Sequence, residues 1–410
     1  MDPGVDRTAD GRQRRLLHVD CDAFFVQVAR LEDPEGVGKE DLLIVGGSPS
    51  GRGVVTSASY AARAFGVRSG MPTSKALRLC PTLVIAPVSR KAISKRSKAV
   101  RTALEDLSPI VQAASVDEFY LDLSGMERLL EGETLQSSAE RIRRRVLEDT
   151  EVSVSIGGAT QKLVAKLATN FAKPAGVHIV PPGGEADFMR RFDLADIPGV
   201  GPSLATSLAD KGLVRVEDAL HVEKEWWEKW FGPSRGQWLY RRIRGVDGSR
   251  VNPREPRKSI SSERTFFEDL TTDDDLERKL MQLACSVGHT VRRSGLRART
   301  VTVKLRDGDF TTRQASRTVD EPIESDAALF RIARELLAEL RRRRRRPARL
   351  IGVGVTNLED LGGRARQLGL FGDDPVVESE RDRQVAKAVD DLNERFGDGA
   401  IVPARVVKRR

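Results

Sequence analysis

Two adjacent carboxylates inside an apolar, strand-forming run constrain this chain more than any other feature. The segment 114–125 reads A-S-V-D-E-F-Y-L-D-L-S-G, which places Asp117 directly before Glu118. Burying two neighbouring negative charges is costly unless a positive charge neutralises them. Consecutive strand residues point to opposite faces, so both side chains can share one site only at a strand end, turn or bulge. A divalent cation that prefers hard oxygen ligands, such as Mg²⁺, would neutralise them there.

A second stretch brings further carboxylates. Residues 16–25 read L-L-H-V-D-C-D-A-F-F, a short apolar strand that runs into Asp20 and Asp22. Two strands that deliver carboxylates to one edge of a sheet can form a two-metal phosphoryl-transfer site. On residue type alone, two strands that end in exposed turn aspartates explain the pattern equally well.

Four motifs that occur in a fixed order decide between these alternatives. They read H-V-D-C-D-A-F-F at 18–25, V-V-T-S-A-S-Y-A-A-R-A-F-G-V-R-S-G-M-P at 54–72, S-V-D-E-F-Y-L-D-L at 115–123 and A-K-P-A-G at 172–176. From about Leu16 to Phe371 the chain resembles the Y-family, or translesion, DNA polymerases, most closely their DNA polymerase IV branch. The resemblance implies a mixed α/β (α+β) multidomain fold of the right-hand type.

The resemblance also implies how the chain divides. The expected segments are a discontinuous catalytic palm at 1–31 and 88–180, fingers at 32–87, a small helical thumb at 181–250, a basic linker at 251–256, a little finger at 257–358 and a flexible tail at 359–410. Within the palm, the strand at 152–156 is predicted to end at Gly157 and Gly158. The next helix, 161–171, is predicted to pack through its apolar residues.

By resemblance, four residues of the palm hold two Mg²⁺ ions. Asp20 binds both ions, Cys21 lends its backbone carbonyl, and Asp117 and Glu118 complete the catalytic set. The family more often has an apolar residue such as Met at the position of Cys21, and we expect the change to be tolerated because only the carbonyl is used. Phe119 is bulkier than the small residue common there, which leaves the local packing open.

Five residues are predicted to bind the incoming nucleotide. Phe25 matches the steric gate, a ring that leaves no room for a 2′-hydroxyl, whereas its neighbour Phe24 reads most simply as core. Tyr60 and Arg63 lie three apart and share a face near a helix N-terminus, a ready anion site, and by resemblance both contact the triphosphate. The alternative is a packed tyrosine beside a surface arginine. Lys173 matches the lysine that reaches the β- and γ-phosphates.

DNA contacts are expected from the thumb, the linker and the little finger. Residues 196–208 resemble a helix-hairpin-helix, in which Gly199 and Gly201 let backbone N–H groups approach a phosphate without reading sequence. Arg244 and Lys258 are expected to follow the duplex backbone. The four tryptophans of the thumb are read as its core and not as a base-stacking platform.

The little finger shows the clearest element order in the chain. Strands are predicted at 258–268, 300–306, 311–317 and 350–356, with helices at 274–294 and 325–342. This β-α-β-β-α-β order is a split βαβ arrangement, which by resemblance lays its sheet in the DNA major groove. The run of six arginines at 341–346 is left without a role, because a solvated helix end explains it as well as DNA contact.

A short peptide in the tail suggests a protein partner. Gln367, Leu368, Gly369, Leu370 and Phe371 match the Q-L-x-L-F peptide by which bacterial polymerases bind their sliding clamp. A helix is predicted after it, at 383–396.

Composition agrees with a protein that binds nucleic acid and argues against a zinc-binding or membrane-spanning protein. The 410 residues carry a net charge of +9 and a pI of about 9.6, which favours a polyanionic partner. Cys21, Cys80 and Cys285 are far apart and form no zinc pattern. No signal peptide or membrane-spanning run is recognisable, so we expect a cytoplasmic protein, most simply a monomer.

The sequence therefore predicts a DNA-directed DNA polymerase that bypasses damaged template bases with low fidelity and has no proofreading exonuclease. Its partners would be primer–template DNA, dNTPs and the sliding clamp. One alternative is a catalytically silent relative that acts only as a DNA- and clamp-binding scaffold. A weaker one is another palm-type metal enzyme, such as a nucleotide cyclase, which would leave the thumb and little finger without purpose.

Overall fold

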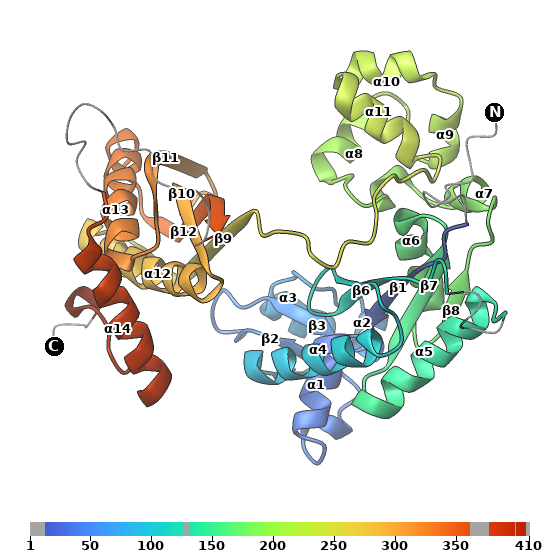
Figure 1. Ribbon diagram of the computed structural model, residues 1–410, viewed down its shortest axis with the longest axis horizontal. Helices are drawn as coiled ribbons and strands as arrows, with labels where there is room; N and C mark the ends of the chain where they lie inside the picture. The colour runs from blue at the N-terminus through green and yellow to red at the C-terminus, as the bar shows by residue number, and fades with distance from the viewer. Residues whose placement is uncertain (1–12, 127–128, 130–131, 361–376, 398, 407–410) are drawn as a thin grey trace. The chain divides into compact units, whose positions relative to one another are not determined.

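The computed structural model describes residues 13–126, 129, 132–360, 377–397 and 399–406. These form two compact units, Met1–Glu255 and Pro256–Arg410 (Figure 1). The boundary falls inside the segment predicted as a linker, 251–256. The finer division of the first unit remains a prediction, and we keep the names palm, fingers and thumb for the corresponding segments.

A five-stranded sheet forms the palm, in the order β5-β6-β1-β7-β8. Figure 1 labels four of these strands, β6, β1, β7 and β8. Its strands are β1 Leu16–Cys21, β5 Val111–Ala113, β6 Glu118–Asp122, β7 Val154–Ala159 and β8 Val177–Ile179. The core side chains of β1, β6 and β7 face helices α1 Phe24–Glu32, α4 Arg90–Glu105 and α5 Leu135–Thr150. Helix α6, Lys162–Ala172, contacts β1 and β7 from the opposite face, where His18 meets Thr169. Alternate residues of a strand share a face, so the side chain of Asp20 lies on the same α6 face of the sheet as that of His18.

The strand prediction around Gly157 and Gly158 is wrong, because β7 continues through both glycines to Ala159. A Cβ on Gly157 would lie 2.2 Å from the carbonyl oxygen of Ala165 and 2.3 Å from the backbone nitrogen of Thr169. Helix α6 thus packs directly on the strand backbone, and a glycine is needed for this close approach rather than for a break.

The fingers contain a three-stranded sheet in the order β3-β2-β4. Its elements are β2 Leu43–Gly46, β3 Val55–Ala58 and β4 Val84–Ala86, with helices α2 Tyr60–Ala64 and α3 Thr73–Leu79, and a 3₁₀ turn η1 Val37–Lys39 before the sheet. Strands β2 and β3 pair antiparallel. Ser59 caps α2 by accepting a hydrogen bond from the backbone N–H of Ala62, which fixes where the helix begins.

The thumb is helical, as predicted. Its elements are α7 Glu185–Met189, η2 Leu194–Asp196, α8 Pro202–Ala209, α9 Val216–Leu220, α10 Lys224–Phe231 and α11 Pro233–Arg242. Its apolar core is continuous with that of α6. Trp227 is fully buried and Trp230 and Trp238 pack against this core, whereas Trp226 is 47% exposed. The expectation that all four tryptophans form the core is therefore wrong for Trp226.

The second unit confirms the predicted split βαβ arrangement. Its elements are β9 Ser259–Leu270, α12 Asp273–Arg293, β10 Leu296–Asp307, β11 Thr312–Ile323, α13 Asp326–Arg343 and β12 Ala348–Asp360. The sheet order is β11-β10-β12-β9 with antiparallel neighbours, so β9 and β10 run parallel with β12 between them. Helices α12 and α13 cover one face through a shared apolar core.

The tail contributes one further helix, α14, at Glu380–Phe396, close to the predicted 383–396. Within the second unit, ion pairs hold this helix to α12, such as Arg292 Nε to Asp390 Oδ2 at 2.6 Å. A final 3₁₀ turn, η3, spans Ala404–Val406. In the described part of the chain, no helix combines the length and apolarity that crossing a membrane would need.

Candidate active site

Asp20 and Glu118 lie directly opposite each other at one end of the palm sheet. They are paired residues in the antiparallel register of β1 and β6. Directly opposite residues of such a pair project from the same face. The pairing brings together two carboxylates that lie 98 positions apart in the sequence. Both side chains are only partly exposed, at 14% for Asp20 and 27% for Glu118.

Two side chains from other elements lie against Glu118, Lys166 of α6 and His18 of β1. The Lys166 ammonium on α6 lies 2.6 Å from Oε1 and 2.5 Å from Oε2 of Glu118. His18 Nε2 lies 3.8 Å from Oε2, beyond an ordinary hydrogen bond, while its Nδ1 meets the Thr169 hydroxyl at 2.8 Å. His18 and Lys166 together lower the pKa of Glu118 to about 2, although burial opposes them. Glu118 is therefore ionised at neutral pH.

Asp20 has a lysine of its own. The Nζ of Lys173 lies 2.7 Å from Asp20 Oδ2, and only 25% of the Lys173 side chain is exposed. Burial raises the pKa of Asp20, and Lys173 only partly offsets this effect. The lysine predicted to reach the nucleotide phosphates thus points at the predicted metal ligand in this structure.

Asp117 is placed differently from the other two carboxylates. Ser115 Oγ donates to Asp117 Oδ1 at 2.5 Å and accepts from the backbone N–H of Glu118 at 3.0 Å, so it shapes the turn before β6. The Asp117 carbonyl accepts from the backbone N–H of Cys21 at 2.9 Å. The Cys21 thiol itself is buried in the palm core, and burial raises its pKa, so only its carbonyl remains as a possible ligand.

The carboxylates do not form a preassembled metal cage. Within the ranges that the structure describes, no three acidic, histidine or cysteine side chains gather in a way that could hold a metal ion. The structure brings Asp20 and Glu118 together and leaves Asp117 turned toward Ser115.

The two phenylalanines after β1 have different environments. Phe24 begins α1 and is 1% exposed within the palm core, as its reading as core predicted. Phe25 is only partly buried and packs against both the palm and the finger clusters. Of the two, Phe25 therefore has ring surface left for a ligand.

Tyr60 and Arg63 are neighbours on α2, as their spacing predicted. The Arg63 guanidinium lies 4.8 Å from the centre of the Tyr60 ring, and its Nε donates to the Ala58 carbonyl at 3.0 Å. The Tyr60 hydroxyl donates to Asp22 Oδ1 at 3.0 Å. Burial raises the pKa of Tyr60, and Asp22 raises it further.

The predicted DNA-contact residues lie in four different settings. Gly199 has φ 96, and a Cβ there would lie 2.7 Å from the Trp238 ring, whereas Gly201 faces open space at the start of α8. Arg244 donates to the Leu220 carbonyl at 2.7 Å and lies 3.6 Å from the centre of the Tyr240 ring, so its guanidinium also stabilises the thumb internally. Lys258 is exposed directly before β9. The predicted clamp peptide, 367–371, lies outside the described residues.

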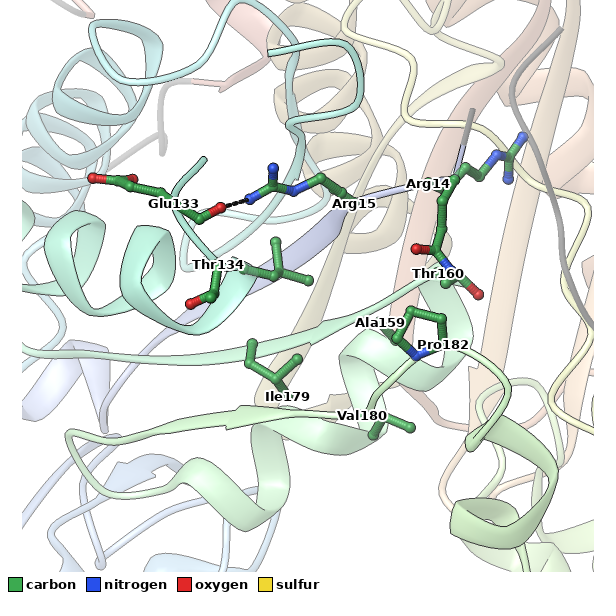
Figure 2. A pocket seen from close by; sticks show the side chains of 11 residues that line it. Arg14, Arg15, Glu133, Thr134, Ala159, Thr160, Ile179, Val180 and Pro182 are labelled. Atoms are coloured by element: carbon green, nitrogen blue, oxygen red, sulfur yellow. Dashed lines mark hydrogen bonds between the residues drawn. The ribbon is translucent and has the colours of Figure 1, made fainter. Parts of the chain in front are cut away.

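Two cavities border the palm. One, of about 380 Å³, is lined by residues that include Asp22, Tyr60 and Pro174 and lies beside the candidate site. The other, of about 540 Å³, is lined by Arg14, Arg15 and the ends of β7 and β8 (Figure 2). In the register of β1 and β7, Leu16 pairs with Ala159 while Asp20 pairs with Ser155, so the second cavity lies at the opposite end of the sheet.

Sequence reasoning missed three residues of the site. Lys166 was passed over as part of an apolar helix, although a lysine among Leu163, Val164 and Leu167 is itself a sign of a buried charge partner. Ser115 had no signal beyond its position before the acidic pair. Asp22 was noted only as a further acidic residue at the strand end.

Three family models match the chain. They are the impB/mucB/samB family at residues 19–170, the thumb domain of DNA polymerase-iota at 195–247 and the C-terminal domain of the impB/mucB/samB family at 257–370. Together they cover most of the chain.

Comparisons with individual relatives and solved structures agree with the family models. The chain is 36% identical over 396 residues to DNA polymerase IV of Caulobacter vibrioides, covering 96% of this chain and 94% of that protein. It is 34% identical over 395 residues to DNA polymerase IV of Dehalococcoides mccartyi, covering 96% and 98%. Among solved structures, the "Y-family DNA polymerase chimera Dbh-Dpo4(243-245)-Dbh" aligns with a TM-score of 0.74 and 26% identity over 84% of this chain and 98% of that chain. The "Insertion ternary complex of Dbh DNA polymerase" aligns with a TM-score of 0.58 and 26% identity over the same shares.

The matched models, the relatives and the paired carboxylates at one end of the palm sheet agree with one another. The chain belongs to the impB/mucB/samB family, the Y-family DNA polymerases, on its DNA polymerase IV branch.

Proposed function

We propose that this chain copies primer–template DNA past damaged template bases, joining dNTPs to the primer 3′ end by two-metal phosphoryl transfer. The observation that carries the proposal is the pairing of Asp20 with Glu118 at one end of the palm sheet, with a lysine bonded to each carboxylate. A family member that had lost catalysis would have no need to keep two half-buried carboxylates facing each other, which is costly without compensating charge.

The donor set fits Mg²⁺. Carboxylate and carbonyl oxygens are the ligands this hard cation prefers, and Asp20, Glu118, Asp117 and the Cys21 carbonyl would hold two ions. Bound there, the ions would lower the pKa of the primer 3′-hydroxyl and neutralise the triphosphate and leaving pyrophosphate. In this structure the ammonium groups of Lys166 and Lys173 supply the positive charge that the two carboxylates require.

The residues around the carboxylates would hold and select the nucleotide. Tyr60, Arg63 and Lys173 come from the fingers and the palm and are the groups proposed for the triphosphate. Phe25, whose ring keeps exposed surface, would exclude a 2′-hydroxyl by steric repulsion. Phe24 would support this ring from the core, since the two centroids are 6.0 Å apart.

Other parts of the chain would hold the duplex and the clamp. Gly201, at the open start of α8, and Gly199 would bring backbone N–H groups to a phosphate. Arg244 and Lys258 would add charge beside the duplex. The 367–371 peptide would recruit the sliding clamp, and the enzyme would act as a cytoplasmic monomer of low fidelity without a proofreading exonuclease.

One primer-extension experiment tests the proposal. The wild type should extend a primer with Mg²⁺ and dNTPs, and Glu118→Ala should bind primer–template normally but lose at least about a thousandfold in rate, since removal of a metal-binding group costs several kcal/mol of transition-state stabilisation. Glu105→Ala is the matched control, because Glu105 forms an exposed pair with Arg101 on α4. A wild type that binds DNA without extending it would favour the scaffold alternative, and near-normal turnover of Glu118→Ala would refute the site.

A further inference from the structure

Asp22 is a buried carboxylate beside the site whose acceptor positions are all bonded, and no metal role explains it. The residue is 4% exposed. Its Oδ1 accepts from the hydroxyls of Tyr60 at 3.0 Å and Ser155 at 2.7 Å. Its Oδ2 accepts from the Ser153 hydroxyl at 2.8 Å and the Ala175 backbone N–H at 3.0 Å. A carboxylate offers about four acceptor sites, so these four donors saturate it and leave none for a metal ion.

The four donors come from separate parts of the first unit. Tyr60 begins α2 of the fingers, Ser155 lies on palm strand β7 and Ser153 precedes it, and Ala175 follows Lys173 by two residues. Hydrogen bonds to a charged acceptor are shorter and stronger than neutral ones. Asp22 thus joins a finger side chain to the turn carrying Lys173.

The turn itself needs such support. Ala175 has φ 54, a left-handed conformation that costs energy for a residue with a Cβ. Its N–H points at Asp22 Oδ2, so the hydrogen bond favours the backbone geometry that aims Lys173 at the site. The Lys173 side chain in turn meets Asp20.

We propose that Asp22 is a positioning residue for the incoming nucleotide: it holds Tyr60 and the Lys173 turn in one preorganised triphosphate cradle and binds no metal itself. The inference rests on the proposed function of those two side chains as phosphate ligands. It extends that function by naming the group on which their relative placement depends. Preorganised groups bind a ligand more tightly, because less freedom is lost on binding.

The test compares Asp22→Ala with Asp22→Asn. Asp22→Ala leaves the Ala175 N–H and the hydroxyls of Tyr60, Ser153 and Ser155 without their acceptor. It should raise KM for dNTP at least about tenfold. Asp22→Asn should recover most of the loss. Its amide oxygen can accept from the Ala175 N–H, while the hydroxyls of Tyr60 and Ser155 can turn to accept from its NH₂ group. The affinity for primer–template and the Mg²⁺ concentration for half-maximal rate should stay within twofold in both variants.

Asp33→Ala is the matched control, since Asp33 also accepts two backbone N–H groups, from Gly36 and Val37, in an exposed turn after α1. It should leave KM for dNTP within twofold. An Asp22→Asn variant as defective as Asp22→Ala, with a raised Mg²⁺ requirement, would show that the negative charge serves a metal and would overturn the proposal.

Where Asp22→Ala does not fold, a double-mutant cycle replaces it. The effects on KM of Asp22→Ser, whose side chain is too short to replace the carboxylate as acceptor, and of Tyr60→Phe should be less than multiplicative, because the Asp22 and Tyr60 side chains share a hydrogen bond. Fully multiplicative effects of these two substitutions would overturn the inference. Equilibrium binding of a fluorescent dNTP to the enzyme–DNA complex separates the two failures. A wild type that binds the dNTP without extending the primer refutes the proposed function, and unchanged dNTP affinity in Asp22→Ala refutes the role of Asp22.

Discussion

Replacing Glu118 with glutamine should destabilise the metal-free protein at neutral pH. His18 and Lys166 hold the pKa of Glu118 at about 2, against 4.5 for an ordinary glutamate. Because one pKa unit corresponds to about 1.4 kcal/mol, this difference contributes at most about 3 kcal/mol to the free energy of unfolding. We expect the free energy of unfolding to fall by about 2 kcal/mol, less than this upper bound. A glutamine side-chain oxygen still accepts a hydrogen bond from Lys166, and His18 Nε2 lies 3.8 Å from Glu118 Oε2, too far for a full hydrogen bond.

The pH dependence follows from the direction of the shift. The folded-state pKa lies below that of the unfolded chain, so the stabilisation is complete above about pH 5 and is lost as the pH falls toward 2. The difference in unfolding free energy between the wild type and Glu118→Gln should therefore roughly halve near pH 3.

Tryptophan fluorescence in urea, with EDTA present, measures this change in the first unit alone. All four tryptophans of the chain, Trp226, Trp227, Trp230 and Trp238, lie in the thumb, whose core is continuous with α6. Glu105→Gln, in an exposed pair with Arg101, should cost less than about 0.5 kcal/mol. If Glu118→Gln is as stable as the wild type at pH 7, the Lys166 pair does not hold the carboxylate and the reasoning fails.

Three further changes test separate parts of the molecule. Phe25→Ala should admit ribonucleotides with little loss of dNTP use, which kinetics with dCTP and CTP would measure. Unchanged discrimination between the two sugars would mean that Phe25 only packs against its neighbours and does not act as a gate. Changing Leu370 and Phe371 to alanine should preserve synthesis on a short primer but remove stimulation by a loaded clamp on a long template, because two apolar anchors would be lost; full stimulation would make the peptide match a coincidence. Gly157→Ala should lower the unfolding free energy of the first unit by about 1–3 kcal/mol, because its Cβ would overlap α6, whereas Gly248→Ala, with its nearest contact at 3.6 Å, should not.

Much of the architecture follows from local patterns in the sequence. The alternation of strand and helix periodicities between Lys258 and Thr356 predicted the β-α-β-β-α-β order, and the structure has it. The spacing of Tyr60 and Arg63 predicted that they share a helix face, and they do. Such features depend on residues a few positions apart, where backbone geometry alone decides which side chains meet.

Other features depend on contacts between distant segments, which no local pattern encodes. The sequence by itself determined that Asp20 and Glu118 lie at strand ends, but the register of β1 with β6 decided that they face each other. Only the packing of α6 on β7 made Gly157 a contact point instead of a strand break, and the same packing placed Lys166 on Glu118. Asp22 acquired its four donors from positions 38 to 153 residues away. A buried charge takes whichever partners the tertiary fold brings within 3 Å, so its role is decided by the fold and not by its neighbours in sequence.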